Sequence, residues 1–91
     1  MVAINFKELE KEFEIFANEH RLAILKCLKN GKSKCVGGIS DEINLSFKIT
    51  SKHLLYLAEQ GILSRHYDGP FVLYSISDNL SSLNKTIISY L

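Results

Sequence analysis

The spacing of hydrophobic residues along the chain changes after Gly61, and this change separates two kinds of predicted element. Up to Gly61, apolar residues recur at intervals of three and four, which is the period of an amphipathic helix. Beyond it, residues 71–76 are rich in β-branched and aromatic side chains, and Asp68-Gly69 in front of them is a two-residue hairpin signal. Helical spacing returns near the end of the chain. The pattern predicts a mainly α fold in which four helices are followed by a small β-hairpin and a fifth helix.

Capping residues and glycines give approximate bounds for the predicted helices. Asn5 with Glu8 resembles a capping box at the start of the first helix. Gly31 supplies the left-handed residue that ends the second helix, and residues 31–34 are expected to form a polar connection. A cap cluster at residues 77–79 precedes the last helix. The expected helices cover residues 5–17, 18–30, 36–43, 45–61 and 79–91.

A tight turn at Asn44, a residue that tolerates the left-handed conformation, joins the third and fourth of these helices. Two helices joined in this way form a helix-turn-helix, and a hairpin directly after them is a wing. The fourth helix carries Lys48, Lys52 and His53 in its first two turns and no acidic residue before Glu59. This distribution is typical of a helix that reads nucleic acid.

Charge is distributed unevenly, although the formal net charge of the 91 residues is only +1. Residues 1–19 carry five glutamates and two lysines, whereas residues 20–34 carry five basic residues and no acidic one. A one-sided electrostatic footprint requires such asymmetry, and a solvated face without a partner also produces it. A chain of this length is expected to form a single domain, 1–91, that buries only about 60 to 65% of its unfolded surface. Dimerisation would therefore add useful burial.

Three motifs occur at the positions that this order of elements gives them. The second helix contains Ala17, Arg21, Leu22, Ile24, Leu25 and Leu28. The fourth helix contains Ser46, Ser51, Lys52, His53, Leu54, Leu57 and Gly61. The hairpin contains Asp68, Gly69, Phe71 and Tyr74. By these motifs, which align without gaps, the chain resembles the ArsR/SmtB family of winged helix-turn-helix repressors over nearly its whole length.

The motifs by which members of this family bind metal are interrupted in this chain. Metal-sensing members begin the third helix with Cys-Val-Cys, where this chain has Cys35-Val36-Gly37. Members that bind metal on the last helix use Asp-x-His near its start, where this chain has Asp78-Asn79-Leu80 and no later histidine. We therefore expect no metal site and no cofactor.

The resemblance implies that the fourth helix enters the major groove of double-stranded DNA and that the wing contacts the backbone or the minor groove. Lys48 would donate to guanine acceptors, and Lys52 would contact phosphate. Thr50 lies on the inward side and is either a DNA contact or a core residue. Phe47 would touch a thymine methyl group or pack beside Leu45. The predicted DNA contacts are Ser46, Phe47, Lys48, Thr50, Ser51, Lys52, His53, Arg65, His66 and Tyr67.

Two of these contacts have alternative roles inside or outside the interface. His53 would donate to a phosphate or be hydrogen-bonded within the fold. Arg65 on the first wing strand is the best candidate for a backbone or minor-groove contact, and a surface arginine without a role is its alternative. The wing is also less basic than is usual for the family, with His66 and Tyr67 where arginine is common.

Apolar stripes on the two terminal helices, at about residues 5–17 and 79–91, predict a dimer interface. The stripe of the first helix would meet a partner chain or close this domain's own core, and the last helix would pack against the first or against the partner's copy. The predicted interface residues are Phe6, Leu9, Phe13, Leu80, Leu83, Ile87 and Leu91. The resulting hypothesis is a homodimeric transcriptional repressor on an inverted-repeat operator, with its two reading helices roughly 34 Å apart.

Other classes of function have less support. No catalytic constellation stands out, so an enzyme is not expected; a winged helix used for protein contact is the main alternative. Cys35 lies near a helix N-terminus beside Lys34, features that lower a thiol pKa, while Cys27 is either a small core residue or a second reactive thiol. A redox-responsive repressor is therefore a lesser alternative. Two cysteines, no leader-like first segment and no long apolar run predict a cytoplasmic protein without a membrane partner.

Overall fold

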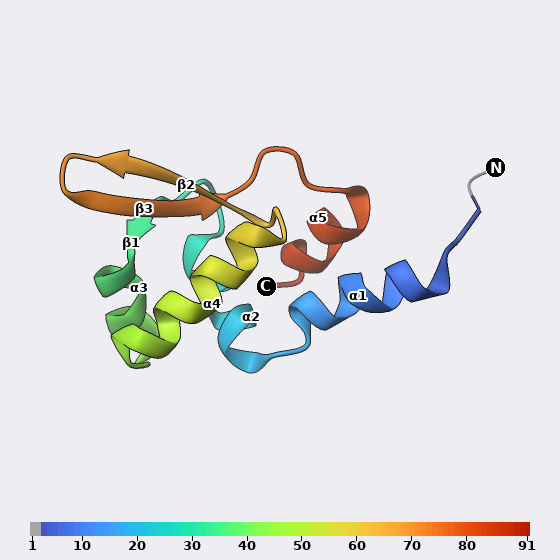
Figure 1. Cartoon of the computed structure of the whole chain (residues 1–91), viewed down its shortest axis with the longest axis horizontal. Helices are drawn as coiled ribbons and strands as arrows, with labels where there is room; N and C mark the ends of the chain where they lie inside the picture. The colour runs from blue at the N-terminus through green and yellow to red at the C-terminus, as the bar shows by residue number, and fades with distance from the viewer. Residues whose placement is uncertain (1–2) are drawn as a thin grey trace.

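The computed structural model describes residues 3–91, in which four helices precede a β-hairpin and a fifth helix (Figure 1). The helices are α1 (Phe6–Phe16), α2 (Glu19–Leu28), α3 (Val36–Ile43), α4 (Phe47–Glu59) and α5 (Ser82–Ser89). The strands are β1 (Lys34–Cys35), β2 (Leu63–Asp68) and β3 (Phe71–Ile76). The predicted fold, a mainly α winged helix-turn-helix, is confirmed.

Side-chain caps fix where the first two helices begin. The Asn5 carboxamide oxygen accepts hydrogen bonds from the backbone N–H groups of Lys7 and Glu8 at 3.1 and 3.2 Å. Asn18 caps α2 in the same way, through the N–H groups of His20 and Arg21 at 2.9 and 3.1 Å. These bonds satisfy N–H groups that have no partner inside the helix. The sequence motif had identified the first of these two caps.

The ends of two helices differ from the prediction. Helix α2 stops at Leu28, because Asn30 and Gly31 both adopt positive φ, at 67° and 73°. Helix α5 begins at Ser82 instead of residue 79, and its cap is Ser81, whose Oγ accepts from the N–H of residue 84. The cluster at 77–79 does not cap the helix: the Ser77 N–H donates to the carbonyl oxygen of residue 62 beside the sheet, and residues 78–79 form a turn.

The sheet has one strand more than the hairpin that the sequence predicted. Strand β1, whose first residue belongs to the predicted polar connection, pairs antiparallel with β3 through Lys34 opposite Tyr74 and Cys35 opposite Leu73, and the strand order is β1-β3-β2. A two-residue strand is too short to show alternation, so only the non-local pairing reveals it. The hairpin turn is also one residue later than expected, because Asp68 already pairs with Phe71 and leaves residues 69–70 as the turn.

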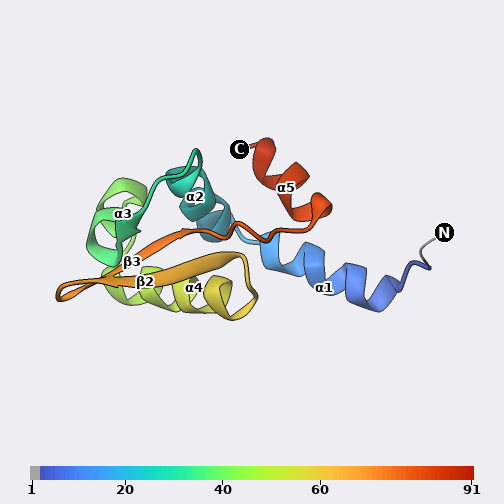
Figure 2. The same cartoon turned by 90° about the horizontal axis from the view of Figure 1, so that it is seen from above.

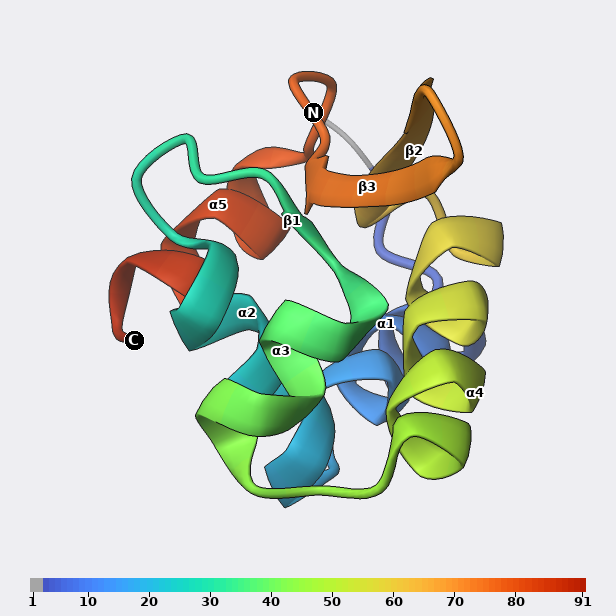
Figure 3. The ribbon, with the colours of Figure 1, turned by 90° about the vertical axis from the view of Figure 1, so that its left-hand side faces the viewer.

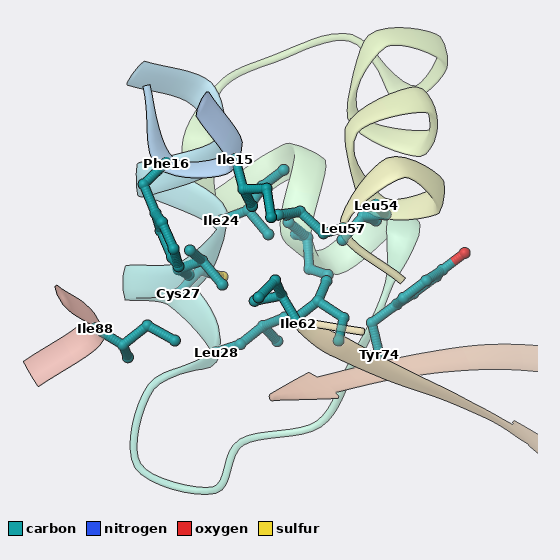
Figure 4. Packing of buried hydrophobic residues seen from close by; sticks show 13 residues of the cluster. Ile15, Phe16, Ile24, Cys27, Leu28, Leu54, Leu57, Ile62, Tyr74 and Ile88 are labelled. Carbon is teal, nitrogen blue, oxygen red and sulfur yellow. The ribbon is translucent and has the colours of Figure 1, made fainter. Parts of the chain in front are cut away.

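The hydrophobic core lies where α2, α3 and α4 meet the sheet (Figure 4). Ile24, Leu28, Leu54 and Leu57 have no exposed surface, and Tyr74 reaches the cluster from β3. Burying each such side chain contributes about 1.5 to 3 kcal/mol, so this cluster sets the relative positions of α2 and α4. The core therefore holds the helix-turn-helix and the wing in a fixed arrangement.

The terminal helices are attached to this body in different ways. Ile15 and Phe16 bury the C-terminal end of α1, while the rest of the helix extends away from the body (Figures 1 and 2). Helix α5 lies beside α2 through the buried Ile88, and the amines of Lys26 and Lys29 on α2 donate to carbonyl oxygens at its C-terminal end. Among the helices of residues 3–91, none has the length and apolar character needed to cross a bilayer.

Candidate nucleic-acid interface

The turn between α3 and α4 places α4 at the surface of the body (Figure 3). Asn44 ends α3 with φ 55° and ψ 51°, the left-handed conformation that the sequence predicted for it. The N–H of Leu45 then donates to the carbonyl oxygen of Ser40 at 3.0 Å, and the Ser46 hydroxyl accepts from the N–H of Ile49 at 3.2 Å. These bonds set the direction in which α4 leaves the turn. Ser46, a predicted DNA contact, is thus the N-cap of α4.

Three buried residues determine which side of α4 faces outward. Thr50, Leu54 and Leu57 have no exposed surface and pack on the core. With 3.6 residues per turn, two adjacent rows of residues lie outside this buried side. We call these two rows the α4 outer face; one comprises Phe47, Ser51 and Leu55, and the other comprises Lys48 and Lys52.

Thr50 has to be removed from the predicted DNA contacts. Its side chain is completely buried in the core, so that it cannot reach a ligand from this position. Its hydroxyl oxygen has no hydrogen-bond partner among residues 3–91. Of the two roles that the sequence left open for this residue, the structure shows the core residue.

The exposed positive charge of α4 is concentrated on its outer face, at Lys48 and Lys52. Several basic residues between 20 and 34 use their charge inside the fold instead. Arg21 donates from Nε and Nη2 to the carbonyl oxygens of residues 15 and 14, both at 2.7 Å. Lys26 and Lys29 cap α5, as described above, and Lys34 pairs with Glu42 at 2.6 Å. The electrostatic footprint is therefore narrower than the charge pattern predicted.

His53 lies at the edge of α4 that faces the start of α2. Its ring is half-buried, with a centroid 5.8 Å from that of His20. Burial, and next the positive charges of Arg21 and His20, lower the pKa of His53 below its usual value of 6.5. These surroundings favour the neutral ring, which can donate one N–H to a partner. Arg21 also places its guanidinium 4.7 Å from the Tyr56 ring, a link to α4 that the sequence did not reveal.

The three candidate residues of the wing divide between its two faces. Arg65 pairs with Tyr74 across the hairpin and holds its guanidinium 5.7 Å from that ring, and Tyr67 lies on the same face two residues further along. His66 points to the opposite face, where its Nε2 is 3.3 Å from Ser33 Oγ. All three side chains are exposed. Arg65 and Tyr67 therefore share one face of the wing, and His66 lies on the other.

A hollow of about 370 Å³ lies between the start of α3, the start of α4 and the tip of the wing. Its lining is mainly apolar and comes from segments far apart in the chain: Cys35, Val36, Gly37, Phe47, Pro70, Phe71 and Val72. Phe47 keeps 62% of its surface exposed at the border of this hollow. Sequence reasoning missed the hollow, because no single stretch contains its walls.

The two candidate thiols occupy different environments. Cys27 is buried in the core with only 4% of its surface exposed, and this burial raises the pKa of its thiol. Cys35 is half-buried and caps α3 through its backbone position. The Lys34 amine lies 3.5 Å from the sulfur of Cys27, so the cation expected beside Cys35 is directed to the other thiol. Among residues 3–91, no group of three or more His, Cys, Asp or Glu side chains is arranged to hold a metal ion.

The predicted dimer residues fall into two groups. On α1, Phe6 and Phe13 leave 79% and 52% of their surfaces exposed, and Leu9 is half-buried. The residues of the C-terminal segment are all half-buried: Leu80, Leu83, Ile87 and Leu91. Of these, Leu80, Ile87 and Leu91 pack on this chain's own core. Among the predicted dimer residues, the exposed apolar surface therefore lies mainly on α1.

Comparison with known proteins gives a family match across the helix-turn-helix. A family model described as the bacterial regulatory protein, arsR family, matches residues 18–65, which is more than half of the chain. The cadmium resistance transcriptional regulatory protein CadC of Listeria innocua serovar 6a is 38% identical over 72 residues, covering 79% of this chain and 60% of CadC. The chain thus spans less than two thirds of the length of that relative.

A second relative is similar in both sequence and structure. The transcriptional activator HlyU of Vibrio cholerae is 31% identical over 81 residues, covering 81% of this chain and 74% of HlyU. The solved structure of HlyU from Vibrio cholerae N16961 matches with a TM-score of 0.80 and 28% identity, covering 98% of this chain and 92% of that chain. The family model and both relatives describe regulators of transcription rather than enzymes. The chain belongs to the ArsR family of bacterial regulatory proteins.

Proposed function

We propose that this chain is a sequence-specific, double-stranded DNA-binding regulator of transcription that acts as a homodimeric repressor on an inverted-repeat operator. The α4 outer face is the observation that carries the proposal. It is fixed in direction by the turn at Asn44 and in rotation by Thr50, Leu54 and Leu57. It presents the exposed amines of Lys48 and Lys52 without an acidic residue before Glu59, three turns away from the start of the helix.

Each contact has a distinct role in this proposal. A recognition helix places its N-terminal residues against base edges in the major groove, so that Lys48 is placed to donate to guanine and Lys52 to phosphate. The wing contributes Arg65 and Tyr67, which share one face of the hairpin. Phosphate contacts set position and orientation, whereas base contacts give specificity.

The dimer supplies the second reading helix. Phe6 and Phe13 leave a large apolar area of α1 in water, and a second copy of the same surface covers it in a two-fold arrangement. Two copies of α4 about 34 Å apart would meet successive major grooves on one side of the DNA. A dimer bound across a promoter in this way blocks transcription.

The proposal assigns no metal ion to the third helix or to α5. CadC is named for cadmium resistance, but the third helix of this chain begins with Cys35-Val36-Gly37 and offers one thiol. Soft metals bind in proteins through several thiolate or imidazole ligands. The chain is therefore expected to bind its operator in the presence and absence of cadmium alike.

The test is a selection of random duplex DNA on the purified chain, followed by binding titrations at several salt concentrations. We expect an inverted repeat whose half-site centres lie about one helical turn apart. Lys52→Ala should weaken binding to all sequences and reduce the salt slope by about 1, while Lys48→Ala should relax preference at one base pair. Lys85→Ala, which removes the same charge from an exposed position on α5, is the matched control.

Transcription in vitro from a promoter that carries the selected site separates repression from activation. We expect the chain to lower transcript yield, and a rise in yield would assign it the role that HlyU has by name. Binding without sequence preference, unchanged by both Lys48→Ala and Lys52→Ala, would contradict the DNA-binding proposal. That result would favour the alternative function, in which the winged helix contacts another protein.

A further inference from the structure

The α4 outer face exposes two large apolar side chains that have no part in the proposed contacts to phosphate and guanine. Phe47 is 62% exposed and Leu55 is 39% exposed. They lie eight residues apart with Ser51 between them, so the three form one row along the helix. Lys48 and Lys52 form the neighbouring row. An apolar row thus runs beside a cationic row on the same face.

The two rows together match the chemistry of one partner, the major groove of DNA. The cationic row suits an anionic partner, because both amines are exposed and no carboxylate on α4 precedes Glu59. Among the base edges of the major groove, the apolar group is the C5 methyl group of thymine. Phe47 and Leu55 are about 12 Å apart along the helix axis, which is roughly three to four base steps of 3.4 Å.

We propose that Phe47 and Leu55 read thymine methyl groups at two positions, three or four base pairs apart, in each operator half-site. The inference rests on the proposed function, since it names the bases that the same face recognises. Phe47 is the stronger contact, because it lies in the first turn of α4, the part of a recognition helix nearest the base edges. Leu55 contacts the second methyl group from the third turn.

The same helix provides a matched control. Ile49 is 44% exposed and is a large apolar residue of α4, similar in exposure to Leu55. With 3.6 residues per turn it projects roughly 160° away from Phe47, about 120° from Leu55 and about 60° from Lys52, so it belongs to neither row. If the thymine preference depended only on exposed apolar surface, Ile49→Ala would reduce it. If Phe47 and Leu55 recognise the methyl groups, Ile49→Ala leaves the preference unchanged.

The experiment replaces thymines of the selected operator one at a time by deoxyuridine, which lacks only the C5 methyl group. For the unaltered protein we expect about a fourfold loss of affinity at each contacted thymine, the equivalent of one buried methyl group. Phe47→Ala should bind thymine and deoxyuridine equally at one position, and Leu55→Ala at the other. Ile49→Ala should keep both fourfold differences.

The outcomes separate this inference from the proposed function. If deoxyuridine is accepted at every position while sequence-selective binding persists, methyl recognition is overturned and the DNA-binding function stands. Deoxyuridine penalties of unchanged size in both Phe47→Ala and Leu55→Ala also overturn it. Absence of any sequence-selective binding overturns both. The first and third of these outcomes are measured on the unaltered chain, so they do not depend on how the variants fold.

Discussion

The ammonium group of Lys34 lies 2.6 Å from Oε1 of Glu42 and ties strand β1 to the last turn of α3. The same nitrogen is 3.5 Å from the sulfur of Cys27, a thiol in the core. Burial raises the pKa of Cys27, Glu42 raises it further, and Lys34 opposes both. Burial is therefore the main influence on the pKa of this thiol, and the ion pair at the edge of the core adds two opposing contributions.

Removing either partner of the ion pair should change the pKa of Cys27 in opposite directions. In a Cys35→Ser background, Glu42→Gln should lower the pKa of the remaining thiol, because it removes a negative charge and leaves the Lys34 cation beside the sulfur. Lys34→Met should raise it. Reaction rates with a thiol reagent between pH 7 and 11 measure both effects. A shift in the same direction in the two variants would show that the pair does not control the thiol.

Substitutions at Thr50 test whether this residue belongs to the core, as the structure shows, or to the DNA interface. Its buried hydroxyl has no hydrogen-bond partner within residues 3–91, so Thr50→Val should raise the free energy of unfolding by about 1 kcal/mol. Thr50→Ser should lower it by about 1 kcal/mol, because the hydroxyl stays and a methyl group is lost. Urea denaturation measures both changes. Operator affinity should be equal in Thr50→Val and the unaltered chain, and a selective loss of affinity would return Thr50 to the interface.

The rotation of α4 shows how far its sequence determines the candidate site. The motif placed Ser46, Lys48, Ser51 and Lys52 on one helix, and the apolar spacing gave the buried side. Spacing alone did not decide the role of Thr50, because a threonine is compatible with either environment. The exposure of Leu55 was not recognised, since a leucine in a helical motif is normally assigned to the core.

Asn44 holds the turn of the helix-turn-helix in the left-handed conformation, at φ 55°. Asn44→Ala should lower the free energy of unfolding by about 1 kcal/mol, because a Cβ-bearing residue without a side-chain amide is strained there. Asn44→Gly should have the original stability or slightly more, since glycine adopts this conformation without strain. The control is Asn79→Ala, in an exposed turn before α5. Equal losses in Asn44→Ala and Asn79→Ala would argue against backbone strain.

His53 should make stability depend on pH near neutrality. Its pKa is lowered in the folded chain, mainly by burial and then by Arg21 and His20, the charged groups that face it from α2. Between that lowered pKa and the unfolded value of about 6.5, the unfolded state binds more protons. Stability is therefore complete above about pH 6.5 and is lost as the pH falls below it.

The measurement is the urea midpoint of the unaltered chain and of His53→Gln at pH 7.5, 6.5 and 5.5. The unaltered chain should lose more stability on acidification than His53→Gln, since the variant lacks this titration. His20 and His66 are present in both proteins, so the difference between them isolates His53. A difference that stays constant over the three pH values would contradict the assignment.

Two departures from the predicted fold involve contacts between distant segments, whereas the early end of α2 reflects the local positive φ angles of Asn30 and Gly31. Strand β1 exists through pairing with β3, and Ser77, in the expected cap cluster of α5, is bonded beside the sheet. The hairpin and the helix-turn-helix were predicted because their signals are local, in the glycine at 69 and the asparagine at 44. His66 is a different case. Its signal is also local, because side-chain alternation along β2 places His66 on the opposite face from Arg65.

The apolar face of α1 should determine the oligomeric state. Phe13→Glu introduces a charge where more than half of the phenylalanine surface is exposed, so it should leave the fold intact and weaken a dimer by at least about tenfold. Lys11→Glu, which projects roughly 160° away on the same helix, should leave the dimer unchanged despite its larger change of charge. Sedimentation at micromolar concentration measures both.

Because two joined reading helices bind one inverted repeat, Phe13→Glu should also lose operator affinity while keeping affinity for an isolated half-site. An unaltered chain that sediments as a monomer and still binds the full operator tightly would contradict the dimer.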